Sequence, residues 1–256
     1  MKATSSILLM AVLLTASCSI REERAGCPCR LEIGLDPFSP LARQVSVGVW
    51  DGPDRWQETV PASGTYVREI TKGIFTVSTW SGQRSGRLSG SQFSVPPRAE
   101  PDSLHVFTTT LDCQDEVCRI TATPHKQYCH VTLRLVREED VPYPYQLYVE
   151  SECCGIDLRD LSPLSGEHIF PVREAPDGHM GFNLLRHDPG ADIALAIYDR
   201  TQRADVLPIG DWMREIGYDW EEEDLKDITL DIDYARQRVW IALAGWEPGT
   251  IVEKEF

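Results

Sequence analysis

Residues 73–82 read GIFTVSTWSG. Thr, Val, Ile and aromatic residues dominate this stretch, and they favour strands because their side chains fit a pleated, half-buried surface. Apolar and polar residues alternate through it with the period of two that a strand requires. Ser81-Gly82 then gives a turn signal. The stretch therefore predicts a strand at 73–80 that ends at a tight turn.

Runs with the same alternation recur on both sides of this stretch, separated by turn residues. They lie at 31–35, 44–50, 65–70, 104–108, 117–123, 128–136, 146–150, 192–199, 227–234 and 237–246. The segment 211–216 differs, because Asp211 is a suitable N-cap for one or two helical turns. Short strands at regular spacing predict an all-β chain built as antiparallel β-sandwiches, with short helical turns near its C-terminal end.

The strand pattern is interrupted at Pro124-His125-Lys126, which is a candidate domain boundary. A chain of 256 residues is long enough for two small domains, each with its own core. We therefore predict an N-terminal β-sandwich over 30–125 and a C-terminal β-sandwich over 126–256. Both halves have the same strand-rich character, without a repeat at the level of individual residues.

The chain begins MKATSSILLMAVLLTASC. Lys2 precedes a short apolar run from Ile7 to Leu14, and the small residues 15–17 follow it. This is the layout of a secretory signal peptide, and the apolar run is too short to span a membrane. The sequence therefore predicts a signal peptide at 1–17 and a mature protein that works outside the cytoplasm.

Small residues that end directly on Cys18 resemble the lipobox of bacterial lipoproteins. In that family the cysteine is acylated, with palmitate for example, and becomes the first residue of the mature chain. The resemblance implies lipidation at Cys18 and a polar tether at 18–29 that lifts the fold off the membrane. The alternative is an ordinary cleaved signal in which Cys18 is incidental.

Acidic residues outnumber basic ones, and the formal net charge is −15. Such a chain argues against nucleic acid as a partner, because phosphate binding needs clustered Lys and Arg. It also argues against binding anionic lipid through the protein surface. We therefore expect contact with a membrane through the N-terminal lipid alone.

Eight cysteines are present, and seven remain as disulfide candidates if Cys18 is acylated. These seven are Cys27, Cys29, Cys113, Cys118, Cys129, Cys153 and Cys154. An exported compartment permits disulfides, and an odd number leaves at least one thiol unpaired. No C-x-x-C pair repeats and no histidine lies at ligand spacing, so no metal site is predicted.

Two pairings are suggested by position. Cys113 and Cys118 flank a polar stretch between two strands, so a bridge closing a hairpin there is one candidate. The adjacent pair Cys153-Cys154 could join Cys129 or the segment 27–29. The sequence leaves this connectivity open.

Motifs of catalysis are absent from the sequence, which holds no G-x-S-x-G, H-E-x-x-H or P-loop. The acidic run 221–224 is interpreted as a solvated helix N-terminus. Asp231 and Asp233 lie two apart on one strand face, but no aromatic groove accompanies them. We therefore predict a protein that is not an enzyme, without catalytic residues and without a cofactor.

Three local features together resemble the FimB/Mfa2 family, the anchor subunits of the fimbriae of Bacteroidales. The first is Cys18 followed by Cys27-Pro28-Cys29 and a strand at 31–35. The second is KGIFTVSTWSG at 72–82, which is similar to a lysine-glycine, strand, Trp-x-Gly signature. The third is the closing strand pair that ends at Gly245-Trp246.

This resemblance implies two tandem transthyretin-like β-sandwich domains and a lipid anchor in the bacterial outer membrane. It also implies a place at the base of a fimbrium, where the protein would hold the shaft subunit (fimbrillin) and limit the length of the fimbrium. An open sheet edge can form such a joint by pairing with a strand of the partner. The tail 250–256 is a candidate for this contact, and a simple last edge strand is the alternative.

A second function is open from the sequence: a surface lipoprotein that binds glycan or peptide on exposed tryptophans. The position of the tryptophans separates the two readings. Three or more on one exposed face favour glycan binding, whereas burial in the domain cores favours the anchor. An exported hydrolase is a third hypothesis, but nothing in the spacing of the residues suggests an active site.

Overall fold

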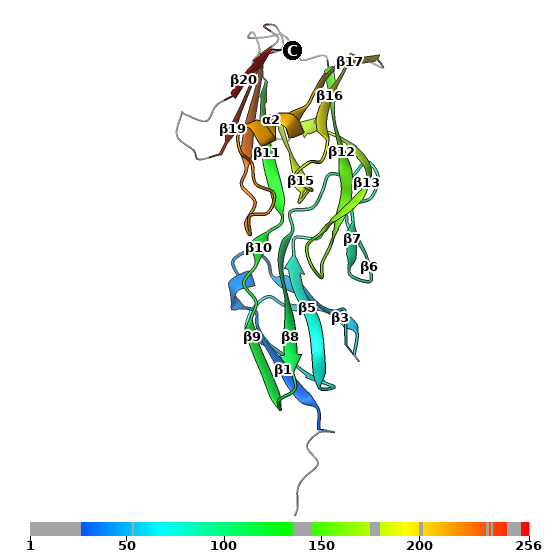
Figure 1. Ribbon diagram of the computed structural model, residues 1–256, viewed down its shortest axis with the longest axis vertical. Helices are drawn as coiled ribbons and strands as arrows, with labels where there is room; N and C mark the ends of the chain where they lie inside the picture. The colour runs from blue at the N-terminus through cyan, green and yellow to red at the C-terminus, as the bar shows by residue number, and fades with distance from the viewer. Residues whose placement is uncertain are drawn as a thin grey trace, which may run out of the picture.

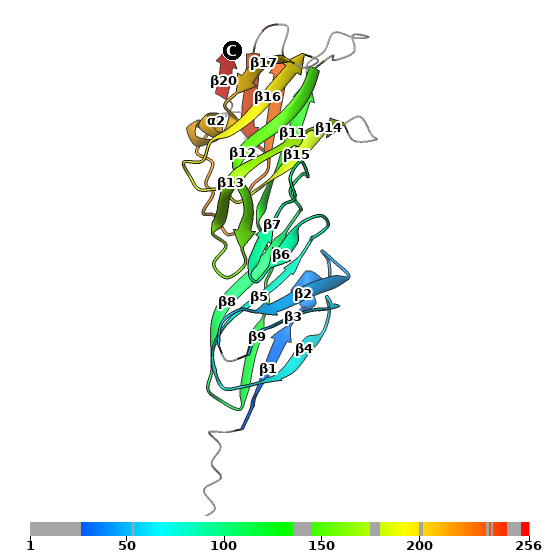
Figure 2. The same ribbon diagram turned by 90° about the vertical axis from the view of Figure 1, so that its right-hand side faces the viewer.

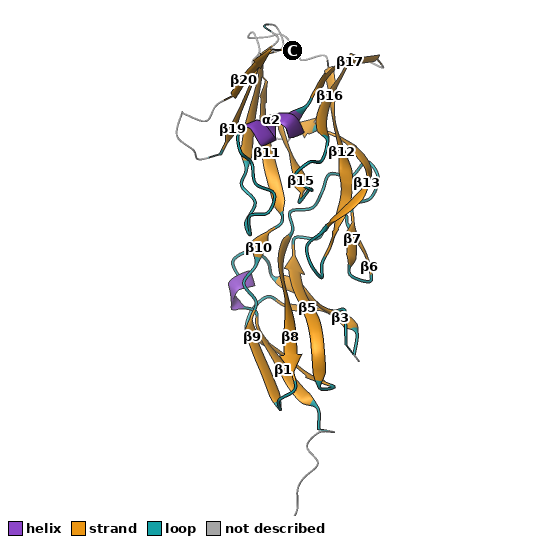
Figure 3. Cartoon of the chain, viewed as in Figure 1, coloured by secondary structure: helices purple, strands orange, loops and turns teal. Residues whose placement is uncertain are grey.

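The computed structural model describes residues 27–52, 54–135, 145–174, 180–199, 202–233, 236, 238–244 and 252–255. Strands dominate these ranges, and two β-sandwiches stack end to end into an elongated rod (Figures 1 and 3). The prediction of an all-β chain with two sandwich domains in tandem is confirmed. The first strand lies at one end of the rod and the last strand at the other (Figures 1 and 2).

The N-terminal domain packs a three-stranded sheet against a five-stranded sheet. The first sheet has the order β4 (Thr65–Ile70), β1 (Cys29–Gly34) and β9 (Val117–Thr121). The second has the order β10 (His125–Lys126), β8 (His105–Cys113), β5 (Gly73–Ser81), β2 (Gln44–Val49) and β3 (Trp56–Pro61). A short 3-10 helix, η2 (Asp36–Phe38), follows β1 and buries Phe38 in the core between the sheets.

The C-terminal domain also has two sheets. The first has the order β14 (Arg173–Glu174), β15 (Met180–Leu185), β11 (Tyr128–Leu135), β18 (Ile228–Asp233), β19 (Arg238–Leu243) and β20 (Val252–Glu255). The second has the order β17 (Gln202–Leu207), β16 (Ile193–Asp199), β12 (Tyr145–Asp157), β7 (Gln92–Ser94) and β6 (Arg87–Ser89), with β13 (Pro163–Pro171) on the other edge of β12. Alternate residues of these strands fill the core between them, as sandwich packing requires.

The helix α2 (Ile209–Glu215) lies between the two layers of the C-terminal domain (Figure 1). It buries Trp212 and Met213 in the domain core. The expected helical turn is therefore present, but Pro208 rather than Asp211 is its N-cap. The interpretation of 221–224 as a helix N-terminus is wrong, because this segment forms turns that fold back onto the start of β11.

The hairpin β6–β7 belongs to the first half of the sequence but extends a sheet of the second domain. β7 pairs with β12 at Gly155, where an added Cβ would lie 2.1 Å from the carbonyl oxygen of Phe93. Only glycine permits this close approach of two backbones. The boundary between 125 and 126 stays a prediction, and the hairpin crosses it.

Most strand pairs are antiparallel as predicted, but one parallel pair occurs in each domain. β1 lies parallel to β9 and β11 lies parallel to β18. Each of these central strands also has an antiparallel neighbour, β4 and β15 respectively. The two domains therefore share one arrangement of strands around their first strand.

Candidate functional site

A third hydrophobic cluster lies between the two domains, separate from their two cores, and we name it the junction cluster. Its buried members are Trp50, Trp80, Phe93, Val95, Leu104, Val106, Cys153, Ile156, Leu158 and Leu185. They come from β5, β8 and the residue after β2 on the N-terminal side, and from β7, β12, β15 and residues that adjoin them on the C-terminal side. Burial of large apolar side chains from both domains stabilises them as one unit.

The strand β5, predicted from residues 73–82, is the centre of this junction. Phe75 and Val77 point into the N-terminal core, and the opposite face carries Ile74, Ser78 and Trp80. Ile74 is 60% exposed, whereas Trp80 is 1% exposed because the C-terminal domain covers this end of the strand. One face of β5 is thus solvent-facing at its start and a domain interface at its end.

Trp80 and the glycine that follows it explain the Trp-x-Gly signature physically. The rings of Trp80 and Trp50 have centroids 5.8 Å apart and are tilted by 31°. Gly82 has φ of +91°, and a Cβ there would lie 1.9 Å from the carbonyl oxygen of Ser103. The glycine therefore allows the chain to turn away directly after the buried tryptophan.

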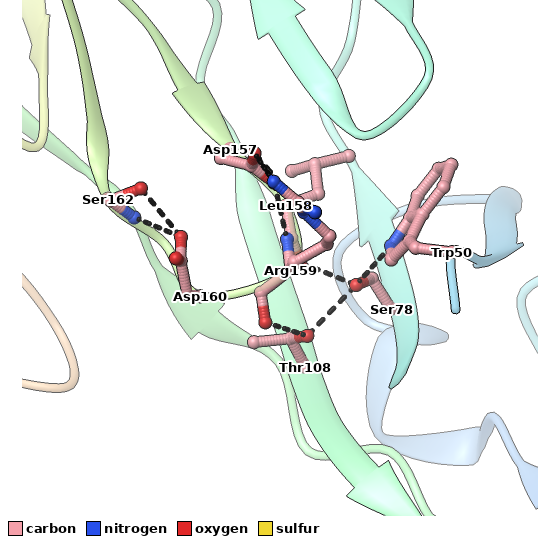
Figure 4. Close-up of polar contacts among 8 residues, drawn as sticks. All are labelled: Trp50, Ser78, Thr108, Asp157, Leu158, Arg159, Asp160 and Ser162. Atoms are coloured by element: carbon pink, nitrogen blue, oxygen red, sulfur yellow. Dashed lines mark hydrogen bonds and ion pairs between the residues drawn. The ribbon is translucent and has the colours of Figure 1, made fainter. Parts of the chain in front are cut away.

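Hydrogen bonds cross the junction through the hydroxyl of Ser78 (Figure 4). Ser78 Oγ accepts from Trp50 Nε1 at 2.8 Å and donates to the carbonyl of Leu158 at 2.5 Å. Thr108 Oγ1 lies 2.9 Å from Ser78 Oγ and donates to the carbonyl of Arg159 at 3.2 Å. The loop after β12 is therefore bonded directly to strands β5 and β8.

That loop is itself held rigid by Asp157 and Arg159 (Figure 4). The guanidinium Nη2 of Arg159 lies 2.8 Å from Oδ2 of Asp157, and the Arg159 main-chain N–H donates to Oδ1 at 3.0 Å. Burial alone would raise the pKa of Asp157, but these hydrogen bonds outweigh burial and lower it. The carboxylate stays charged and fixes the two carbonyls that face the N-terminal domain.

The chain that connects the domains is clamped as well. Gln127 is fully buried, and its N–H donates to the carbonyl of Leu104 at 2.9 Å. Arg186 Nε donates to the Gln127 side-chain oxygen at 2.8 Å, and its Nη2 donates to the carbonyl of Glu222 at 2.7 Å. Asp224 accepts from the Lys126 N–H at 2.7 Å. The connector is therefore a packed element rather than a free linker.

Sequence reasoning missed these junction residues. Asp102 is another example: it is 4% exposed and accepts main-chain N–H groups of Ser85 and Gly86, at 3.0 and 2.8 Å. It thereby fixes the loop that leads into the crossing hairpin β6–β7. An isolated aspartate in a proline-containing loop carries no sequence signal for such a role.

The far end of the rod carries the terminal strand β20, which pairs with β19 as the last strand of its sheet. Arg238 of β19 lies 3.2 Å from Glu253 and 3.5 Å from Glu255. Lys254 lies 2.6 Å from Glu215 of α2. The outer edge of β20 has no strand beside it among the described residues, so its backbone groups there are open to a partner strand.

The described cysteines are all free thiols, and the structure separates them. Cys27 is exposed, Cys129 is buried in the C-terminal core and Cys153 lies in the junction cluster. Burial raises the pKa of Cys129 to about 12 and that of Cys153 to about 11, which makes both thiols unreactive. Cys129 and Cys153 lie in different clusters, and the pairings suggested for Cys153 stay predictions.

Cys29, Cys113 and Cys118 do come together, in the N-terminal core. Burial raises the pKa of Cys113, and the neighbouring thiol of Cys118 raises it further. We expected Cys113 and Cys118 to flank the turn of a hairpin. The strands that they adjoin, β8 and β9, lie in different sheets and therefore do not form one. A disulfide within this trio stays a prediction, and so does a disulfide at any of the other candidate cysteines. One of these candidates, Cys154, is not a member of the junction cluster.

The signal peptide, Cys18 and most of the tether lie outside the described residues, so lipidation stays a prediction. None of the helices within the described ranges has the length and apolar character that crossing a bilayer requires. No group of three His, Cys, Asp or Glu side chains in the same ranges is arranged to hold a metal ion.

The tryptophans were expected to separate an anchor from a glycan-binding platform. Trp50, Trp80, Trp212 and Trp220 are buried, Trp56 and Trp240 are half-buried, and Trp246 lies outside the described residues. Two of the buried ones fill the junction rather than a domain core. Within the described part of the chain, no tryptophan platform faces the solvent.

Known structures share this two-domain arrangement, although no protein-family model and no curated protein matches the sequence. The fimbrial anchor protein Mfa2 from Porphyromonas gingivalis superposes with a TM-score of 0.59 at 13% identity, over 86% of this chain and 98% of that one. The chain has the Mfa2 fold. The structural resemblance expected from the three sequence features is thereby confirmed.

Two further structures have the Mfa2 fold. A candidate polysaccharide-binding protein from Bacteroides thetaiotaomicron gives a TM-score of 0.61 at 13% identity, over 89% of this chain and 98% of that one. A candidate adhesin from Bacteroides ovatus gives a TM-score of 0.59 at 15% identity, over 93% of this chain and 98% of that one. At these identities the comparison establishes a shared fold.

Proposed function

We propose that this protein is a structural lipoprotein that anchors fimbriae to the bacterial outer membrane and limits their length. Acylated Cys18 would hold one end of the rod in the membrane. The opposite end would contact the shaft subunit, a fimbrillin, through a sheet edge. The role requires no catalytic residue, cofactor or nucleic acid.

The observation that carries this proposal is the rod with its first and last described strands, β1 and β20, at opposite ends (Figure 2). A tether that starts at Cys18 leads to β1 at one end, and β20 lies at the other end. A protein that connects a membrane to a filament needs such separated attachment points. The Mfa2 fold, shared with a fimbrial anchor protein, supports the same role.

The junction between the domains supports a load-bearing role. An anchor transmits pulling force along its long axis, so a flexible linker between the domains would extend under load. Here the connector residue Gln127 is buried and bonded, and the junction cluster joins both domains. The buried tryptophans stabilise the rod, which favours the anchor over a tryptophan-based glycan platform.

The contact with the shaft would use the edge of the C-terminal sheet at β20. Main-chain hydrogen bonds along an open edge give a strong joint without any active site. The charged side chains of β20 would discourage random pairing, so a partner strand must bring complementary groups. The strand sits at the end of the rod that faces away from the tether.

Fimbriated cells that carry only a variant of this protein test the proposal. Cys18→Ala should release both protein and fimbriae into the medium, whereas the control Cys27→Ala should leave them attached. Deletion of residues 250–256 should leave the protein in the membrane but shed the fimbriae, or lengthen them in electron micrographs. Normal fimbriae on cells carrying the deletion would contradict the role of β20, and normal fimbriae with Cys18→Ala would contradict the anchor.

A further inference from the structure

An open pocket of about 630 Å³ lies on the outer face of the C-terminal domain. Figure 2 shows the strands β13, β12 and β16 that form its floor toward the viewer. Its lining residues are Arg98, Gln146, Tyr148, Ile169, Pro171, Arg173 and Tyr198. We name it the tyrosine–arginine pocket.

Strand pairing positions the tyrosines. Tyr148 of β12 faces outward because its neighbours Leu147 and Val149 fill the core. Tyr198 of β16 stands on the same face, since Gln146 pairs with it in the register. The two rings meet edge to face with centroids 5.3 Å apart. The pocket is therefore lined by two tyrosine rings that stand nearly perpendicular to each other, so a ligand ring can stack on the face of only one of them.

Two arginines give the lining of this pocket a positive charge, although the chain as a whole is acidic. Arg98 and Arg173 are exposed, and neither forms an ion pair with a described residue, although the charge of Arg173 also acts on the nearby carboxyl of Glu100. Glu150 follows Tyr148 by two positions in β12 and so lies on the same face of the strand. Its carboxylate is already paired with Arg203, at 2.8 Å. No acidic side chain lines the pocket. In a chain of net charge −15, this is a local site for an anion.

The backbone at Arg98 is held in an unfavourable conformation. Its φ is +64°, in the left-handed region that a side chain disfavours. The next residue fixes the loop, because the carbonyl of Ala99 accepts from His168 Nε2 at 2.9 Å and its N–H donates to Pro96 at 3.1 Å. Strained residues held in this way cluster at ligand sites.

We propose that the tyrosine–arginine pocket binds a carboxylated sugar, such as a uronic acid residue of an acidic glycan. The apolar face of a pyranose ring can stack on one of the two tyrosine rings, and a guanidinium matches the geometry of a carboxylate. Gln146 offers an amide for sugar hydroxyls. The pocket has the size that small ligands occupy.

An acidic peptide is disfavoured by the backbone at this site. Residues of β12 in the floor are already paired on both sides, with β13 and with β16. An added peptide strand would therefore find no free main-chain groups along this part of β12. Recognition must proceed through side chains, which suits a sugar ring with a single carboxylate.

The test uses the full chain in detergent and short oligogalacturonate as the probe, with neutral malto-oligosaccharide of equal length for comparison. Calorimetry should show binding of oligogalacturonate alone, weakened at high salt. Arg98→Gly removes the guanidinium but suits the backbone at φ +64°, and Arg173→Gln keeps the length of the side chain. Each should weaken binding about tenfold or more, because each removes charge-assisted hydrogen bonds to the carboxylate.

The control Arg43→Gln makes the same change of charge on the N-terminal domain and should bind as the parent does. Equal binding of the neutral sugar, or unchanged binding by the double pocket variant, would overturn the proposal. Tighter binding of tetraglutamate than of oligogalacturonate would overturn the assignment to a sugar. The inference does not rest on the anchor role, since pocket variants should leave fimbrial attachment intact.

Discussion

The two domains arrange strands around β1 and β11 in the same way, but they finish that sheet differently. In the N-terminal domain the sheet stops at β9, the strand parallel to β1. In the C-terminal domain the corresponding strand β18 is followed by β19 and β20, which extend the sheet by two more strands. The chain therefore adds two strands beyond β18 in the C-terminal domain and none beyond β9 in the N-terminal domain.

The edges also differ in side chains. The strands β4 and β9 expose Val67 by 46% and Val117 by 38%. The terminal strand β20 instead carries Glu253, Lys254 and Glu255, which pair with charged neighbours. The difference indicates that β20 is an addition to a complete sandwich, at the end of the rod where we propose that a filament attaches. The predictions below follow the expected size of their effect.

The largest effect is expected where the two domains meet. Trp80→Ala removes the largest buried side chain of the junction cluster and should lower the free energy of unfolding by about 3–5 kcal/mol. Urea unfolding should change from one transition to two, because the domains lose their coupling. Trp80→Phe is the control and should keep a single transition; two transitions in the parent protein would contradict the shared junction.

Acid should lower the free energy of unfolding, because His187 in the C-terminal domain is buried in its neutral form. Burial lowers the pKa of His187 to about 4, and its Nδ1 lies 2.6 Å from the carbonyl of Leu185. The unfolded chain binds this proton more readily, so stability is complete above about pH 6.5 and falls toward pH 4. A shift of this size corresponds to about 3 kcal/mol.

Denaturant titrations at several pH values measure this loss. In His187→Phe the free energy of unfolding should change less between pH 6.5 and pH 4. The remaining, smaller change is due to His168, because burial lowers the pKa of that residue as well. An unchanged slope in His187→Phe would show that the proton is taken up elsewhere.

A smaller effect is expected from the polar centre of the junction. Ser78→Ala leaves Trp50 Nε1 and the carbonyl of Leu158 without this partner, which should cost about 1–3 kcal/mol. Ser46→Ala removes a hydroxyl that bonds Thr59 at an exposed position in the same sheet. Thermal unfolding should show a clear loss of stability for Ser78→Ala only. Equal losses in both variants would mean that the hydrogen bond at the junction stabilises the protein no more than an exposed one does.

The smallest effect is expected at the terminal edge. Arg238→Gln breaks both ion pairs to β20, but exposed pairs contribute at most about 1 kcal/mol. Hydrogen exchange of the β20 amides should therefore remain close to that of the parent. Complete loss of their protection would show that charge, rather than backbone pairing with β19, holds this edge.

Strands with clear alternation were predictable, and β2, β5 and β11 lie where the sequence places them. The strand β13 was missed because prolines begin and end it and Gly166 interrupts it, as an edge strand tolerates. The strand β3 was missed because its polar residues on one face mask the pattern.

The junction could not be predicted, because it depends on which distant segments pair. Nothing local shows that the hairpin β6–β7 joins β12, or that the hydroxyl of Ser78 faces Leu158. The same holds for Cys113 and Cys118, whose separation of five positions suggested a hairpin although the chain crosses between sheets there. Local pattern predicts a strand, and tertiary structure decides its neighbours.

The anchor role is tested most directly by extracting native outer membranes gently with detergent, capturing this protein and analysing what accompanies it by mass spectrometry. The account predicts a fimbrial shaft subunit in the captured material and acyl groups on Cys18. An acylated protein recovered alone, or together with components of glycan uptake, would contradict the anchor and indicate a surface binding lipoprotein.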